Sequence, residues 1–172
     1  LQLLLDDVIE FSDELLWVTE LNKWENDNFE DYLWVNDSAQ KSLSEERLRE
    51  LIRYRNSEKF NNISLQIDAG DFSQEDVLVI LSDIEGWYED TKVLLSSLEQ
   101  TLNNSIKSLG SLWDIEINAF VWTINGYQSQ LQWSYGGFLS FKSGVESFFS
   151  TYRDNQESIQ RNIDLQKQDI DT

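Results

Sequence analysis

Residues 117–141 read INAFVWTINGYQSQLQWSYGGFLSF and carry no charge, whereas the whole chain of 172 residues holds 13 basic and 32 acidic side chains. The stretch also holds five side-chain amides and seven aromatic residues. Because aromatic side chains bury large apolar areas, we expect it to form the inner wall of a helical core, a partner surface or a pocket. The aromatic residues are Phe120, Trp122, Tyr127, Trp133, Tyr135, Phe138 and Phe141.

The spacing of apolar residues in this stretch fits two secondary structures. Ile117, Ile124 and Leu131 recur in phase with a helix, and the phase continues into the following segment. Alternating apolar residues around Asn125-Gly126 instead fit a hairpin, because this dipeptide favours tight turns. We predict a helix and keep a short β-hairpin near 117–135 as the alternative.

The other long segments show amphipathic helical patterns separated by polar breaks. Proline is absent and glycine occurs seven times, which is typical of long helices with few ordered turns. We therefore predict an all-α fold, an antiparallel helical bundle of four or five long helices forming one domain over 1–172, with the first and last helices side by side. The remaining expected helices cover 1–35, 42–57, 73–109 and 138–171.

Local signals place the ends of these helices. Ser42 with Glu45 reads as a capping box, and Ser73 reads as an N-cap with acidic residues in the following turn. We expect a turn at 36–38, a break with a short extended piece over 60–72 and a further turn at Gly136-Gly137.

Charge and composition exclude several classes of function. The formal charge of −19 disfavours nucleic acid and anionic membrane surfaces, because both bind basic patches, but it permits a basic protein partner. The chain has no Cys and no His, so disulfides, imidazole metal sites and Ser-His nucleophiles are excluded. No catalytic residue, metal or cofactor is predicted, since the many carboxylates form no pair that stands out as an acid–base couple.

Two groups of residues are candidate ligand sites. Arg49 and Arg53 lie four residues apart and share a helix face, so their guanidinium groups can hold a small anion; the alternative is salt bridging with neighbouring glutamates. Trp122, Tyr127 and Trp133 offer rings on which a neutral ligand such as a sugar can stack; the alternative is packing in the helical core.

The chain begins at Leu1 without an initiator methionine, so we expect a segment of a longer protein. In length, helix pattern and missing initiator it resembles the ectodomains of bacterial transmembrane receptors such as chemoreceptors and histidine kinases. The resemblance implies a non-catalytic, extracytoplasmic (periplasmic or extracellular) sensor domain. It would bind a small-molecule ligand between helices, reach the membrane only through flanking segments, and be compatible with a homodimer.

Two other functions fit the same sequence. An acidic protein–protein interaction module, such as an inhibitor or immunity protein, would use the charge of −19 to attract a basic partner. A helical pore-forming toxin component would insert 117–141 into a membrane, although the amides in this stretch make a poor hydrocarbon surface.

Overall fold

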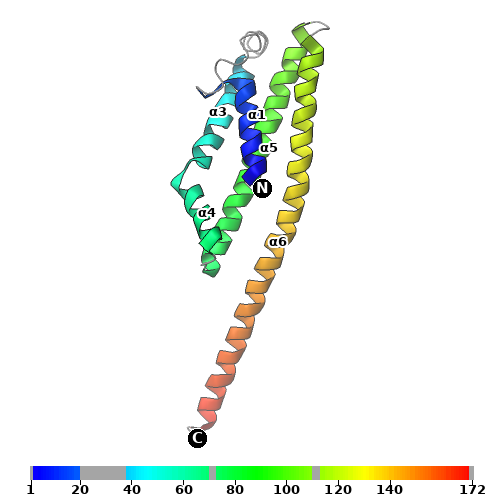
Figure 1. Ribbon diagram of the computed structural model, residues 1–172. Helices are drawn as coiled ribbons and strands as arrows, with labels where there is room; N and C mark the ends of the chain where they lie inside the picture. The colour runs from blue at the N-terminus through cyan, green and yellow to red at the C-terminus, as the bar shows by residue number, and fades with distance from the viewer. Residues whose placement is uncertain (1, 20–37, 70–72, 110–112, 171–172) are drawn as a thin grey trace.

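The computed structural model describes residues 2–19, 38–69, 73–109 and 113–170. Within these ranges the chain forms five helices and no strand, so the all-α prediction is confirmed (Figure 1). The helices are α1 (Gln2–Leu16), α3 (Ser38–Arg55), α4 (Glu58–Ala69), α5 (Gln74–Leu109) and α6 (Trp113–Ile170).

Helix α5 is the centre of the arrangement. It runs antiparallel to α6 over most of its length, while α3 packs against it on another side. Helix α1 lies between α3 and α6 (Figure 1). Among the described helices, α5 and α6 are long, at 36 and 58 residues, whereas α1, α3 and α4 have 15, 18 and 12. The fold is therefore bundle-like, but a bundle of four or five long helices is not confirmed for the described residues.

The core forms where α1, α3 and α6 meet α5. Leucines on one side of α5 are fully buried and contact apolar residues from all three neighbours. Burial of each large apolar side chain stabilises the fold by roughly 1.5–3 kcal/mol before entropy is counted. The central residues are Val8, Leu48, Leu94, Leu95, Leu98, Leu102, Ile117 and Ile124.

The alternative β-hairpin near 117–135 is wrong, because α6 continues through this stretch and through Gly136-Gly137 as one helix. Ile117, Ile124 and Leu131 recur every seven residues and are all buried in the core. A hairpin would break this row, so burial outweighs the local turn preference of Asn125-Gly126, which lies on the exposed side.

The expected helix over 1–35 ends early, at Leu16. Trp17 has a φ of 54°, and the Asp13 carboxylate accepts hydrogen bonds from the Thr19 backbone N–H, at 2.8 Å, and the Thr19 hydroxyl. The left-handed conformation of Trp17 ends the helix, and the Asp13 carboxylate holds the turn that follows. The rest of the expected helix and the turn at Asn36-Asp37 lie outside the described residues.

Two other expected boundaries also differ from the structure. Helix α3 begins at Ser38, so Ser42 lies inside the helix and not at its cap. The break over 60–72 is instead helix α4 up to Ala69. Ser57 begins this helix by accepting a 3.2 Å hydrogen bond from the Phe60 N–H, and Phe60 is buried, which supplies the packing that α4 needs.

The predicted start of α5 is confirmed by its cap. The Asp76 N–H donates to Ser73 Oγ at 3.1 Å, and the Ser73 N–H donates to the Asp76 carboxylate at 3.0 Å. This reciprocal pair satisfies two backbone donors that a helix start otherwise leaves free.

Helix α6 extends well past the other helices. Its 58 residues span about 87 Å, and every side chain from 150 to 168 is exposed. We call residues 143–168 the overhang; Figure 1 shows it leaving the bundle at one end. Among the described helices, none combines the length and apolar character that a membrane crossing requires.

Candidate functional site

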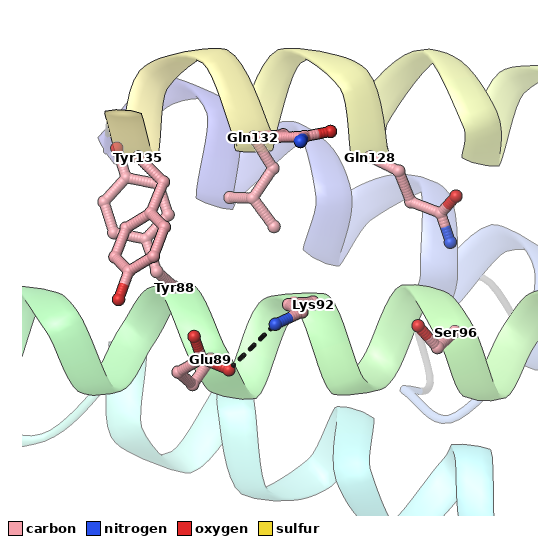
Figure 2. Close-up of a pocket in the computed structure, with 8 residues that line it drawn as sticks. Tyr88, Glu89, Lys92, Ser96, Gln128, Gln132 and Tyr135 are labelled. Carbon is pink, nitrogen blue, oxygen red and sulfur yellow. Dashed lines mark hydrogen bonds and ion pairs between the residues drawn. The ribbon is translucent and has the colours of Figure 1, made fainter. Parts of the chain in front are cut away.

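A groove of about 480 Å³ lies between α5 and α6, and each helix contributes one wall (Figure 2). Residues three or four apart share a face of a helix, so the same spacing that packs the two helices also brings polar side chains to the rim. The lining residues are Tyr88, Glu89, Lys92 and Ser96 from α5, and Gln128, Leu131, Gln132 and Tyr135 from α6.

The floor and one end of the groove are aromatic and apolar. Leu131 and Tyr88 are buried, and the Tyr88 and Tyr135 rings lie 4.8 Å apart between centroids. Phe138 continues the cluster, 5.6 Å from Tyr88. Burial raises the pKa of both tyrosines, and Glu85 raises the pKa of Tyr135 further, so both hydroxyls stay protonated at neutral pH.

The α5 wall carries charges of both signs. Lys92 Nζ lies 3.3 Å from Glu89 Oε2, with both side chains at least half exposed, so the pair is open to a ligand as well as to water (Figure 2). Such an exposed pair is worth little as a stabilising contact. Its ammonium and carboxylate are therefore available at low cost to partners in the groove.

The α6 wall carries amides and a hydroxyl. Gln128 donates from Nε2 to Glu99 at 3.1 Å, while Tyr135 donates to Glu85 at 3.4 Å. Lys142 contacts the same Glu85 carboxylate and lowers its pKa. These contacts tie α6 to α5 on both sides of the groove and hold its walls in register.

Arg49 and Arg53 do not reach the groove. Both lie exposed on α3, which packs on a different side of α5 from α6 (Figure 1). Arg49 Nη2 is 3.0 Å from Glu45 Oε2 on the same helix, as the salt-bridge alternative predicts. An anion site at the two arginines stays a prediction.

The three aromatic candidates do not converge on one site. Trp122 and Trp133 are 78% and 85% exposed, and their spacing of 11 residues places them on the same outer side of α6. Tyr127 faces inward and packs against Phe11 at 5.5 Å between ring centroids. Tyr127 is therefore a packing residue, and the two tryptophans form an outward-facing row away from the groove.

None of the five candidate ligand residues named from the sequence lines the groove. Gln128, Gln132 and Tyr135 belong to the uncharged stretch that was singled out, but the α5 residues were missed. Tyr88 reads as one member of an apolar helix face, and Lys92 as a surface charge. Only the antiparallel pairing of α5 with α6 brings the two sets together, and neither sequence segment encodes that pairing by itself.

No group of three or more Asp or Glu side chains in the described ranges is placed to hold a metal ion. Comparison of the chain with protein family models, curated protein sequences and solved structures found no match.

Proposed function

We propose that this is a non-catalytic, extracytoplasmic ligand-binding domain of a signalling receptor, in which the α5–α6 groove takes a small polar ligand. The observation that carries the proposal is that α6 forms one wall of the groove and continues as an unbroken helix beyond the bundle. A ligand that slides or tilts α6 relative to α5 would therefore move the overhang. Sliding and tilting of packed helices is an established way to pass on such a signal.

The groove chemistry favours a small zwitterion with a planar or apolar part. Lys92 and Glu89 offer opposite charges on one wall, Gln132 offers an amide on the other, and Tyr88 with Tyr135 offers aromatic surface at the end. The volume of about 480 Å³ lies within the range of small-molecule sites. An α-amino acid with an aromatic or amide side chain has this combination of groups.

The same groups argue against catalysis as the role of the groove. The Glu85 carboxylate next to it has a lowered pKa, whereas a general acid needs a raised one. Binding with release of the unchanged ligand is the simplest use of such a groove.

A binding experiment with matched variants tests this function. Amino acids and related zwitterions are screened by thermal shift and by NMR chemical shifts, and hits are repeated on Lys92→Gln and Gln132→Ala. We expect both variants to weaken binding at least tenfold. Lys167→Gln, which removes an equal charge from the overhang, should bind like the wild type. Equal affinity for Lys92→Gln and wild type would contradict the proposal.

A second candidate is an acidic protein-interaction module, and the exposed Trp122 and Trp133 favour it. Tryptophan is enriched among residues that dominate binding energy at protein interfaces, and two of them share one side of α6. A basic partner would be drawn in by the charge of −19. Loss of partner binding in Trp133→Ala, with groove variants unaffected, would support this function over the first.

A further inference from the structure

We infer that two copies of this chain pair through the side of α6 that faces away from α5, as an antiparallel dimer with two-fold symmetry. This inference goes beyond ligand binding and does not depend on the groove.

The side of α6 opposite α5 is exposed and carries no charge. Between Ile117 and Thr151 the charged residues are Lys142, which contacts Glu85 on α5, and Glu146, one turn further along the same side of the helix. Charged residues are depleted at the centre of protein interfaces, and 26% of the residues of this chain are charged, so an exposed face without charge is suited to be covered. We call this side the outer face. Its exposed members are Asn118, Ala119, Trp122, Gly126, Ser129, Gln130, Trp133, Gly136, Gly137, Ser140, Gly144, Ser147, Phe148 and Thr151.

A large aromatic side chain and a recess that can receive one lie side by side on the outer face. Trp133 is 85% exposed, and an open recess of about 690 Å³ beside it contains Gly136, Gly137 and Ser140. Residues three, four and seven positions apart are neighbours on a helix surface, and four such neighbours form the hole that takes a side chain of a facing helix. A Cβ atom at either glycine would meet no atom within 4 Å, so the recess is free. A side chain and a matching recess on one face make that face self-complementary.

Antiparallel pairing brings each of these side chains to the recess of the other copy. A two-fold axis level with Tyr135 places Trp133 of one copy opposite Gly137 of the other, and the reverse. The same axis places Gly126 opposite Gly144, where two backbones without side chains can approach closely. A parallel, in-register pair would instead set Trp133 against Trp133 and leave the two recesses facing each other unfilled. The antiparallel arrangement therefore packs better.

The aromatic side chains of the outer face are large enough for a stable pair. The same register places Trp122, which is 78% exposed, opposite Phe148, which is 65% exposed. Together with Trp133, each copy contributes three aromatic side chains, and burial of about 150 Å² for each gives roughly 900 Å² before the small residues between them are counted. A specific interface needs about 1,000 Å² or more, so the outer face reaches the required size.

The acidic bundles stay apart in this arrangement. The outer face lies on the opposite side of α6 from α5, so both α6 helices stand between the two bundles (Figure 1). Three helix-to-helix distances of roughly 8–10 Å then separate the two α5 axes, about 24–30 Å in all. This distance exceeds the Debye length of about 10 Å at roughly 0.1 M salt, so repulsion between the bundles is largely screened. A basic partner would be attracted to the acidic bundle and not to an uncharged face, which favours a second copy here.

Molecular mass in solution tests the pairing. The wild-type chain should sediment at twice its mass of 20.2 kDa at micromolar concentration, without larger assemblies, because a two-fold interface closes on itself. Trp133→Ala should weaken the dimer at least tenfold. Gly137→Leu should do the same by filling the recess, although leucine favours the helix, whereas the single methyl group of Gly137→Ala leaves the recess open.

A matched control separates the outer face from the overhang. Ile159 is 59% exposed but lies beyond the paired part of α6, so Ile159→Ala should remain dimeric. Unchanged helix content by circular dichroism shows that each variant folds.

Cross-linking tests the orientation. The chain has no cysteine, so introduced thiols give unambiguous products. Gly126→Cys and Gly144→Cys should each fail to cross-link alone, because identical positions lie about 27 Å apart along the antiparallel pair. A mixture of the two variants should form a disulfide dimer on oxidation, because the two thiols then lie opposite each other.

Four results would overturn the inference. The first is a wild-type chain that stays at 20.2 kDa, even if its tryptophans bind another protein. The second is a Trp133→Ala variant that pairs as tightly as the wild type. The third is a monomeric Ile159→Ala variant, which would place the contact on the overhang. The fourth is a Gly126→Cys variant that cross-links by itself, since that product requires a parallel pair.

Discussion

The hydroxyl oxygens of Ser44 on α3 and Ser97 on α5 lie 2.7 Å apart in the interior of the protein. Ser44 also lies 3.0 Å from the Thr101 hydroxyl, and the Gln40 amide donates to Ser97 Oγ at 3.0 Å. Small side chains let the two helices approach closely, and hydrogen bonding satisfies the buried polar atoms. The α3–α5 contact is thus a polar seam set beside an apolar core.

Substitution of Ser44 by alanine should lower the free energy of unfolding by about 1–3 kcal/mol, because its buried hydroxyl partners on α5 lose a hydrogen bond. Urea denaturation followed by circular dichroism measures the change. Ser42→Ala is the control, since Ser42 is exposed on the same helix, and it should change stability by less than about 0.5 kcal/mol. Equal effects of the two variants would show that the seam contributes nothing specific.

Phe60→Ala should lower the free energy of unfolding by about 3–5 kcal/mol, because it leaves a cavity in the core. Phe60 is 2% exposed, its ring stacks on Trp87 at 4.4 Å, and the Arg55 guanidinium lies 4.5 Å above it. Thermal and urea unfolding give the measurement. Leu65→Ala, on the exposed side of the same helix, is the control and should change the free energy of unfolding only slightly. A loss below about 1 kcal/mol for Phe60→Ala would contradict the packing of α4 on α5.

The contact of Lys142 with Glu85 predicts a pH dependence. The hydrogen bond from Lys142 lowers the pKa of Glu85 below its usual 4.5 in the folded state. A lowered folded-state pKa contributes stability that is present above the unfolded-state pKa and is lost as pH falls through the folded-state pKa. Glu85→Gln should therefore lower Tm at pH 7, and the difference from wild type should vanish in acid well below pH 4.5.

Lys142, the partner of Glu85, sets the upper limit of the pH range in which this contact stabilises the fold. The same hydrogen bond raises the pKa of Lys142 above 10.5, so its contribution is lost only as pH rises through the raised value. Glu46→Gln, at an exposed position on α3, is the control for the loss of one negative charge in Glu85→Gln. A Tm difference between Glu85→Gln and wild type that stays constant from neutral pH into acid would contradict the role of this contact.

Gly137→Ala should stabilise the protein by about 0.5–1 kcal/mol, because glycine is a poor helix former. A methyl group at this position meets no atom within 4 Å, and the same holds for Gly86 in α5, which serves as the parallel test. Differential scanning calorimetry measures both. Destabilisation by Gly137→Ala would instead indicate close approach of another chain to that side of α6.

The long helices could be predicted from sequence where local signals and burial agree. Ser73 and Asp76 cap α5 as their spacing indicates, and the heptad phase of Ile117, Ile124 and Leu131 indicates the helix that forms. Where the local sequence preference conflicts with packing between helices, the packing determines the structure. The Asn125-Gly126 turn signal is overridden by burial of its neighbours against α5.

The candidate site was harder to predict because it belongs to two helices. Arg49 and Trp133 stand out in the sequence by residue type, yet Arg49 pairs with Glu45 and Trp133 faces outward. Tyr88 and Gln132 are ordinary members of their helix patterns and become neighbours only through the α5–α6 register. Sequence periodicity determines which face a helix buries, but not which residues of another helix lie opposite.

Lys142 lies closer to the groove residue Gln128 than to Gln168 near the end of α6, and this gives the helix the geometry of a lever. If the Glu85 contact is the pivot, the arm from Gln128 measures about 21 Å and the arm to Gln168 about 39 Å, at the usual rise per residue. A tilt imposed at the groove would then appear at the far tip nearly doubled in size and opposite in direction.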